Sequence, residues 1–412
     1  MLVPAGRLPE RPTLDRPILY IARRNETLII CASALSRHRG ASNWTHPKTI
    51  SAARSTELAS ELPAIGKISP EIFDEIILPH LGASSPHVLV GPQHGVDVGV
   101  VDLGGDLVMA ITTDPFFIVP QYGWERAAWF AVNILASDAA TSGLRPTYMA
   151  VDLNLPLSMT RDALEIMWTT VHRECQKIGM AIVTGHTARY EGTDYPMVGG
   201  ATVMSVGPKS QYVTPNMAQP GDLVIVTKGP AIEATGLFAV TFPQLVAQRY
   251  GADFARKAEE VFWKMSVVDD AMAAASVGVR DNGVTAMHDA TECGVWGGLF
   301  EIAQASRVGM QIDKEKIIVP EEVVKICDMF QIDPYSSISE GTLLLTCRPH
   351  KAGEVVRVLA GKGIQSSIVG EVTPQEQGIK VFEGGRSHAL QHPRVDPFWQ
   401  AYGKALAGGS AK

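Results

Sequence analysis

The chain has 412 residues, of which 46% are hydrophobic and 19% charged, and its formal net charge is −7. This length exceeds that of one ordinary core, so we expect a globular protein with two domains. The negative charge gives no support for a nucleic-acid partner, and no apolar run is long enough to predict a membrane span. The five cysteines form no C-x-x-C pair, which argues against a zinc ribbon or a disulfide framework and favours the cytoplasm.

Residues 1–66 are polar and basic in part, with little periodicity, and we expect them to form an extension of uncertain order. The remainder predicts two α/β units of similar size, 67–214 and 215–390, followed by a tail at 391–412. In the first unit the predicted elements are a short helix at 69–82, two strands joined at Gly104-Gly105, a helix at 124–142, a strand at 148–153, a helix at 161–179 and two further strands.

The second unit begins with the strand "DLVIVT" and continues with two long helices, predicted at 233–250 and 255–277. The strand "VTAMHD", a helix at 295–306 and the strand "GMQID" follow. The segments "TLLLTC", "KAGEVVRVLAGKG" and "QSSIVGEV" then predict a strand, a helix and a strand. The alternation of strands with helices is typical of an α/β fold.

Three acids of the first unit stand where α/β folds place ligands. Asp97 precedes a strand, Asp114 ends the next strand, and Asp138 lies in the long helix "NILASDAATSG". Each acid alone has a structural explanation, since Asp97 and Asp114 fit turns and Asp138 fits a helix break. If the three carboxylates converge, they repel one another, and a hard cation such as Mg²⁺ with phosphate oxygens removes that repulsion. Their convergence therefore predicts a metal–polyphosphate site.

The segment "VTGHTARY" adds a second candidate element. A strand that ends in Thr-Gly allows backbone N–H groups to approach a phosphate, because Gly185 has no Cβ. His186 fits either a catalytic role or that of an ordinary polar loop residue. The chain contains no Walker P-loop, no G-x-G-x-x-G after a strand, and neither G-x-S-x-G nor H-E-x-x-H, so ATP binding requires another scaffold.

Taken together, these motifs resemble the aminoimidazole-ribonucleotide synthetase (PurM-like) superfamily, over about residues 66–382. "GVDVGVV", "ITTDPF", "SDAATSGLRP" and "VTGHTA" are similar to four segments of its first half. "VTAMHDATECGVWGGLFEIAQASRVGMQID" and the pair Glu340-Gly341 resemble the second half of the hydrogenase-maturation branch, the HypE-like proteins.

The resemblance implies a two-domain α/β fold whose N-terminal domain pairs into a barrel-like sheet across a homodimer. It implies ATP and Mg²⁺ as cofactors, with Asp97, Asp114 and Asp138 as metal ligands. The nucleotide would be lined by those acids together with Thr113, Gly185, His186 and Thr187. Asp289, Glu292 and Glu340 are the candidate catalytic residues of the second half.

Four departures from the HypE-like pattern limit what the resemblance implies. The chain ends "ALAGGSAK" without the terminal cysteine that carries the carbamoyl group in HypE. Ala188 replaces the lysine of G-D-T-K and His186 its acid, and Arg189 is no equivalent of that lysine. Cys293-Gly294 replaces a Gly-Gly pair, and Cys293 fits a small buried residue or a reactive thiol.

The sequence therefore predicts an ATP- and Mg²⁺-dependent enzyme that phosphorylates an amide, carboxyl or similar oxygen of a small molecule or a protein-borne amide. One alternative is a small-molecule kinase, like thiamine-monophosphate kinase. Another is a nucleotide-binding assembly protein without turnover.

Overall fold

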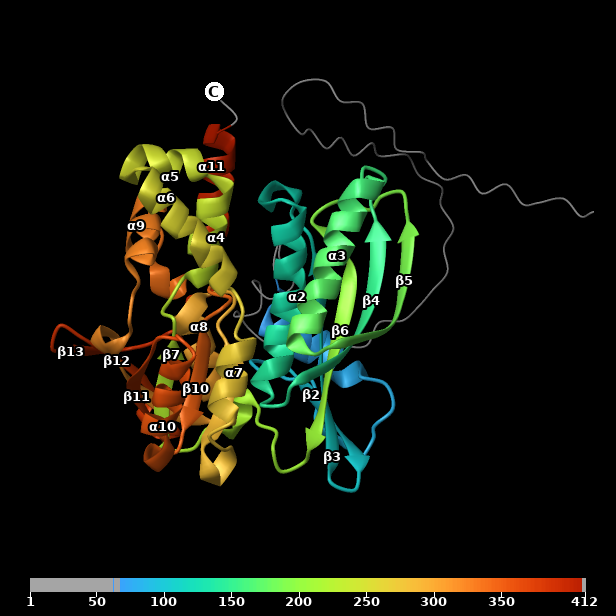
Figure 1. Cartoon of the computed structure of the whole chain (residues 1–412). Coiled ribbons are helices and arrows are strands. Elements are labelled where there is room, and N and C mark those ends of the chain that lie inside the picture. The colour runs from blue at the N-terminus through green and yellow to red at the C-terminus, as the bar shows by residue number, and fades with distance from the viewer. Residues whose placement is uncertain (1–61, 63–66, 410–412) are drawn as a thin grey trace, which may run out of the picture. The chain divides into compact units, whose positions relative to one another are not determined.

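The computed structural model describes residue 62 and residues 67–409. The predicted extension therefore lies mostly outside the described residues, and so does Cys31 (Figure 1). Two β-sheets with flanking helices follow each other along the described chain, and this confirms the mixed α/β class. One sheet is formed within 88–208 and the other within 223–389, whereas the predicted boundary at 214–215 stays a prediction.

The first sheet has the strand order β1-β2-β3-β6-β4-β5. The strands are β1 Val88–Val90, β2 Gly99–Gly104, β3 Leu107–Phe117, β4 Pro146–Leu155, β5 Ala181–Arg189 and β6 Met197–Pro208. All neighbours are antiparallel except β4 and β5. Alternate residues of β3, among them Val108, Ala110 and Thr112, are buried, as expected for a strand with one covered face. The pairing of this sheet across a dimer stays a prediction.

Two long helices cover one face of the first sheet, α2 Trp124–Thr141 and α3 Arg161–Ile178 (Figure 1). Thr160 caps α3 by accepting a hydrogen bond from the Ala163 amide, and Gly179 ends it in the left-handed conformation. α2 also contacts α7 and β8 of the second half, so it is buried on nearly all sides. This burial explains why the sequence of α2 is apolar on nearly all faces of the helix and why Asp138 is buried.

The second sheet has the strand order β13-β12-β9-β11-β7-β10-β8. The strands are β7 Leu223–Thr227, β8 Val284–Asp289, β9 Val308–Asp313, β10 Leu343–Cys347, β11 Ser366–Pro374, β12 Ile379–Glu383 and β13 Arg386–Ala389. Ile225 packs with α7 Val268–Ala275 and α10 Pro349–Gly361, whereas Val224 packs with α8 Gly294–Ser306 on the other face. Cover on both faces explains the unbroken apolar run of β7.

Two helices predicted in the second half are broken in the structure. The helix expected at 233–250 divides at Phe242-Pro243 into α4 Ile232–Thr241 and α5 Pro243–Tyr250, because proline cannot continue an α-helix. The helix expected at 255–277 is α6 Ala252–Glu259, a 3₁₀ segment Glu260–Lys264 and α7. Short 3₁₀ and π segments also replace most of the helix predicted at 69–82, leaving α1 Pro70–Ile72.

A helical cluster beside the second sheet contains two further helices, α9 Glu321–Phe330 and α11 Pro397–Gly409. α11 lies in the segment expected to be a tail. Phe398 is 1% exposed and packs edge-on against Phe238, with ring centroids 5.0 Å apart. This aromatic contact holds the C-terminal helix in the core. No helix in residues 67–409 combines the length and apolar character that a membrane crossing requires.

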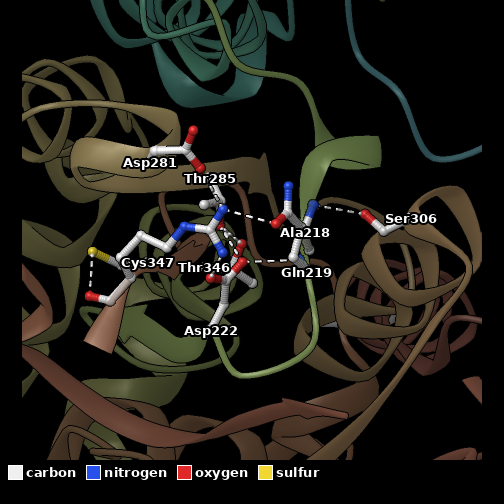
Figure 2. A network of polar contacts seen from close by, with 9 residues as sticks. Ala218, Gln219, Asp222, Asp281, Thr285, Ser306, Thr346 and Cys347 are labelled. Carbon is white, nitrogen blue, oxygen red and sulfur yellow. Dashed lines mark hydrogen bonds and ion pairs between the residues drawn. The ribbon is translucent and has the colours of Figure 1, made fainter. Parts of the chain in front are cut away.

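The segment that connects the two sheets is anchored by a buried polar network (Figure 2). Asp222 is fully buried, and its carboxylate accepts hydrogen bonds from the Gln219 amide (2.8 Å), the Thr285 hydroxyl (2.7 Å) and Arg348 Nη1 (3.0 Å). Arg348 Nη2 also donates to Gln219 Oε1 (2.7 Å) and to Asp281 (2.8 Å). Every oxygen of Asp222 thus has a donor, which is the condition for burying a carboxylate at low cost.

Candidate active site

Asp97 of the first half contacts a histidine of the second half. It lies in the loop before β2, and its Oδ2 is 2.7 Å from Nδ1 of His288 on β8. His288 Nε2 is 2.8 Å from Oε2 of Glu301 on α8. Burial disfavours the charged imidazole, but the two carboxylates outweigh it and raise the pKa of His288 well above its usual range. His288 therefore acts as a buried cation between two acids.

Asp114 and Asp138 meet where β3 faces α2. Asp114 follows Thr112 by two positions, so both side chains point to the α2 side of the sheet. Thr112 donates a 3.0 Å hydrogen bond to Asp138 Oδ2. Burial raises the pKa of Asp138, and the charges of Asp289 and Asp114 add to this effect. The pKa of Asp114 is also raised, by loss of hydration that contact with Asp138 offsets only in part.

Asp289 and Glu340 supply the second half's share of the acids. They are 0% and 1% exposed, and none of their four carboxylate oxygens has a partner in normal hydrogen-bond geometry within the described chain. Burial and the charge of Asp97 raise the pKa of Asp289 to about 7. Burial, Asp289 and Glu233 raise the pKa of Glu340 well above its usual range. These two acids are therefore buried without the donors that normally accompany a buried carboxylate.

Glu233 lies beside Glu340 at the start of α4. Its Oε2 accepts a 3.1 Å hydrogen bond from the Glu340 amide, which ties the loop before β10 to α4. Burial raises the pKa of Glu233 to about 8. A third carboxyl group of the second half thus lies beside Asp289 and Glu340, with one oxygen that accepts a hydrogen bond.

The rim of the site carries one ion pair. Lys67 Nζ lies 2.9 Å from Glu292 Oε2, and both side chains are open to solvent. Partial loss of hydration raises the pKa of Glu292, but the nearby ammonium group of Lys67 outweighs this effect and holds the pKa below its usual range. The same ammonium group also acts on Asp97, Asp114 and Glu301 through its charge.

Next to Glu292, the Cys293 amide donates to Asp396 Oδ2 (2.7 Å), and burial raises the pKa of the Cys293 thiol to about 12. This pKa does not favour a reactive thiolate.

Three predicted nucleotide contacts lie away from these acids. Gly185, His186 and Thr187 do not follow a strand end as expected, because β5 continues to Arg189. Register places Gly185 opposite Val151, Val151 opposite Ala201 and Ala201 opposite Asp114. Three strand spacings, about 14 Å, therefore separate Gly185 from Asp114.

The absence of a Cβ at Gly185 has a structural cause in this fold. An added Cβ would lie 2.3 Å from the Val151 carbonyl oxygen of the neighbouring strand.

Thr113 differs from Asp114 because it points to the opposite face of β3, where it donates a hydrogen bond to the Ala201 carbonyl (3.1 Å). The nucleotide-lining role of these residues stays a prediction.

The sequence analysis missed His288, Glu301, Glu233 and Lys67. A histidine beside an aspartate in the otherwise apolar strand "VTAMHD" was a usable signal, because a strand buried on both faces rarely carries two ionisable residues. Glu233 and Glu301 carry a weaker signal: each is the one acid of a largely apolar helix, but neither was interpreted as part of the site. Contacts with distant parts of the chain give them their position.

The donor set fits a divalent cation with oxygen ligands. Four unpaired buried oxygens on Asp289 and Glu340 require a positive charge or hydrogen-bond donors. Asp97, His288 and Asp289 each offer an atom within 4.8 Å of the others, and they are the one group of three potential ligands at this spacing among the described residues. Asp114 and Asp138 adjoin this group without belonging to it. Carboxylates of this kind suit Mg²⁺, which prefers oxygen ligands.

Family models match most of the described chain. Residues 95–206 match the AIR synthase related protein, N-terminal domain, and residues 219–382 match the C-terminal domain of the same family. Together these ranges cover more than half of the chain, in the expected order.

Two curated relatives show how far the similarity extends. A putative hydrogenase expression/formation protein of Methanocaldococcus jannaschii is 25% identical over 76% of this chain and 90% of its own length. Carbamoyl dehydratase HypE of Rhizobium leguminosarum bv. viciae is 25% identical over 69% of this chain and 79% of its own length. The second name is that of an enzyme, so the predicted enzyme class is confirmed at the level of the family.

Solved structures confirm the PurM-like fold. The HypE–HypF complex matches with a TM-score of 0.59 and 20% identity, over 78% of this chain and 99% of the matched chain. A hydrogenase maturation protein HypE in complex with ATP matches with a TM-score of 0.57 and 19% identity, over 81% and 97%. At this identity the likeness concerns the fold alone. The two family models and the fold agree that the chain belongs to the AIR synthase related family, within the PurM-like superfamily.

Proposed function

We propose that the protein is an ATP- and Mg²⁺-dependent enzyme that activates an amide, carboxyl or similar oxygen by phosphorylation. The observation that carries this proposal is the pair of buried, unpaired carboxylates of Asp289 and Glu340, which face Asp97 and Asp138 of the other half. Acids from both halves surround one place, and His288 and Lys67 supply fewer positive charges than there are acids. A divalent cation that joins the acids to a polyphosphate would supply the missing positive charge. The similarity to an ATP complex of HypE supports ATP as the nucleotide.

Within this proposal Asp97, Asp114 and Asp138 hold the metal, with Asp289 as a fourth oxygen donor. When bound, Mg²⁺ neutralises charge on the phosphoryl group and so lowers the barrier to its transfer. Glu292 and Glu340 are the catalytic candidates on the substrate side. Lys67 offers the basic group that Ala188 does not, because its ammonium lies at the rim beside Glu292.

Glu340 fits the role of a general base. Burial and the charges of Asp289 and Glu233 raise the pKa of Glu340, which makes its carboxylate a stronger proton acceptor than an exposed one. An amide that is activated at its oxygen must lose N–H protons, and the unpaired oxygens of Glu340 are available to accept them. The structure thus offers a metal-binding side and a proton-accepting side in one site.

Thermal unfolding with and without Mg-ATP tests the nucleotide site. At about 100 times the dissociation constant, a ligand that binds only the folded state adds about 2.7 kcal/mol. We expect this gain in the wild type, its loss in Asp138→Asn, and its retention in the control Asp106→Asn, whose side chain is exposed in the β2–β3 turn. A wild type that gains nothing at millimolar Mg-ATP would contradict the proposal and favour an assembly protein without turnover.

The fate of the phosphate separates the enzyme classes. Phosphorus NMR after turnover distinguishes inorganic phosphate, expected for an activation reaction, from a stable phosphorylated product, expected for a small-molecule kinase. The HypE–HypF complex supports trials with protein-borne amides beside small molecules. A homodimer and a cytoplasmic location stay predictions.

A further inference from the structure

His288 occupies an unusual position for a buried histidine. It is 2% exposed on β8, yet both ring nitrogens lie within hydrogen-bond distance of a carboxylate oxygen. One carboxylate, Asp97, belongs to the first half and lies 191 positions away in the sequence. The other, Glu301, belongs to α8 of the second half. One imidazole ring therefore joins the loop before β2 to the second half.

The ring restricts Asp97 more than a single hydrogen bond would. The two nitrogens of an imidazole belong to one rigid planar ring and point in different directions within its plane, so a rotation that releases Asp97 also breaks the contact with Glu301. The contacts are 2.7 and 2.8 Å long, as expected for hydrogen bonds between charged groups. In a buried place these bonds are stronger than they are in water. Asp97 is thus held in one orientation from the second half.

A second contact brings the same loop to the same helix. Gly95 has φ +68°, and a Cβ added there would lie 2.7 Å from Cβ of Glu301. The loop backbone therefore rests directly on α8 at the residue that also holds the far side of the His288 ring. Backbone contact and side-chain contact independently place the loop 94–97 against the second half.

We infer that His288 is a positioning residue, which orients Asp97 for metal binding and makes the metal site of the first half depend on the second half. This inference rests on the proposed Mg-ATP site. His288 does not bind the metal itself, because both ring nitrogens are engaged by Asp97 and Glu301. Its role is to keep one oxygen of Asp97 occupied so that the other is presented to the cation.

Two substitutions separate the two ends of the ring. In His288→Asn the amide nitrogen takes the place of Nδ1, so the donor to Asp97 is retained and the contact with Glu301 is lost. In His288→Gln the amide nitrogen reaches the place of Nε2, so the contact with Glu301 is retained and the donor to Asp97 is lost. Both variants remove the ring and introduce one amide, so a purely structural role predicts equal effects.

The readout is the Mg²⁺ concentration that gives half-maximal binding of a fluorescent ATP analogue to the full chain. We expect this concentration to rise tenfold or more in His288→Gln and about threefold in His288→Asn, at similar unfolding midpoints. In an Asp97→Asn background, His288→Gln should add no further loss. Equal losses in the Asn and Gln variants, or a larger loss in Asn, would overturn the inference.

Direct ligation by His288 predicts a different result. Both variants would then lose affinity, and the preference for Mn²⁺ over Mg²⁺ would fall in each, since imidazole suits the softer ion. That outcome would also overturn the inference. A wild type that binds no nucleotide at any Mg²⁺ concentration would refute the proposed function instead, so the two failures are distinguishable.

Glu301→Ala provides a test if the ring variants do not fold. The Glu301 side chain is 30% exposed, so its truncation disturbs the core less than a change of His288. The ring then loses its far anchor, and we expect the Mg²⁺ requirement to rise about threefold. An unchanged requirement would show that the ring does not need this anchor and would overturn the inference.

Discussion

Two buried groups of acids in this protein have opposite surroundings. Asp222 is 0% exposed, and both of its oxygens accept hydrogen bonds, from Arg348, Thr285 and the backbone (Figure 2). Asp289 and Glu340 are as deeply buried and have no such donors. The first group is complete within the chain, whereas the second requires something from outside it. A buried acid therefore indicates a ligand site through its unpaired oxygens, and burial by itself indicates nothing.

The difference also has a cause in the sequence. The side-chain partners of Asp222 are a neutral residue and a cation. Thr285 lies on β8, and Arg348 directly follows β10. The site acids meet mainly other acids, because α2, β8 and the loop before β10 each contribute a carboxylate. Folding brings these charges together at a cost, and a cation that binds there offsets the cost.

The largest effect is expected for Asp222→Ala. This substitution leaves the largely covered Arg348 guanidinium with only the exposed Asp281 as an ionic partner, and removing one member of a buried pair costs about 3–5 kcal/mol. Urea unfolding measures the loss, which should be the same with and without Mg-ATP. The control is Asp281→Ala, on the exposed side of the same arginine, and it should resemble the wild type. A small loss in Asp222→Ala would mean that the network is dispensable.

Neutral isosteres at the site should act in the opposite direction. At pH 8 without metal, Asp289→Asn removes a buried charge that accepts no hydrogen bond, and we expect a gain of about 2 kcal/mol; Glu340→Gln replaces a carboxyl group whose pKa burial raises and should not destabilise. The gain from Mg-ATP should be reduced or lost in the same proteins. Asp222→Asn is the matched control, because the same chemical change at a fully paired carboxylate should destabilise. Destabilisation of the metal-free Asp289→Asn protein would break the comparison between the two groups.

The sequence predicts the helices and strands that carry these acids better than it predicts contacts between residues far apart in the chain. The helix that carries Asp138 and the strands that carry Asp114 and Asp289 were predicted close to their observed bounds, because their apolar periodicity is a local signal. Residues 255–277 were predicted as one helix, but the chain turns there through a 3₁₀ segment, and aromatic residues of this region pack into the core. Packing against distant elements decides such breaks, and no local pattern records it.

The same limit applies to the candidate site. Asp97, Asp114, Asp138, Asp289 and Glu340 were selected from motifs, and the structure brings them into one electrostatic group. His288 was missed because its partner Asp97 lies 191 positions away. Gly185 was interpreted as a phosphate contact, although its lack of a Cβ already follows from close packing on Val151. A glycine in a motif thus has more than one physical explanation until its neighbours are known.

The pH dependence of stability provides a third test of the comparison. The pKa of Asp289 is about 7 in the folded protein, against about 3.9 for an unperturbed aspartate. Between these values the folded state holds a proton that the unfolded state has released. The free energy of unfolding should therefore fall as the pH rises from about 4 to about 7, by up to about 1.4 kcal/mol per pH unit, and then level off.

Urea unfolding of the metal-free protein between pH 4.5 and pH 8 measures this slope. Asp289→Asn should make the slope shallower, and the residual slope should come from the other acids whose pKa is raised, namely Glu233 at about 8, Asp138 and Glu340. A slope of the opposite sign in the wild type would show that the site acids are stabilised in their ionised form without any metal.

The smallest effect concerns single hydroxyl groups. Thr285→Val keeps the shape of the side chain but removes a donor to Asp222 and a contact of 2.6 Å with the Thr346 hydroxyl. Because the carboxylate then lacks one donor, we expect a loss of about 1 kcal/mol by urea unfolding, with the Mg-ATP gain unchanged. Thr373→Val is the matched control, since the Thr373 hydroxyl is buried without a partner among the described residues and its removal should be neutral or stabilising. Equal losses at both positions would mean that the paired hydrogen bond does not determine the cost.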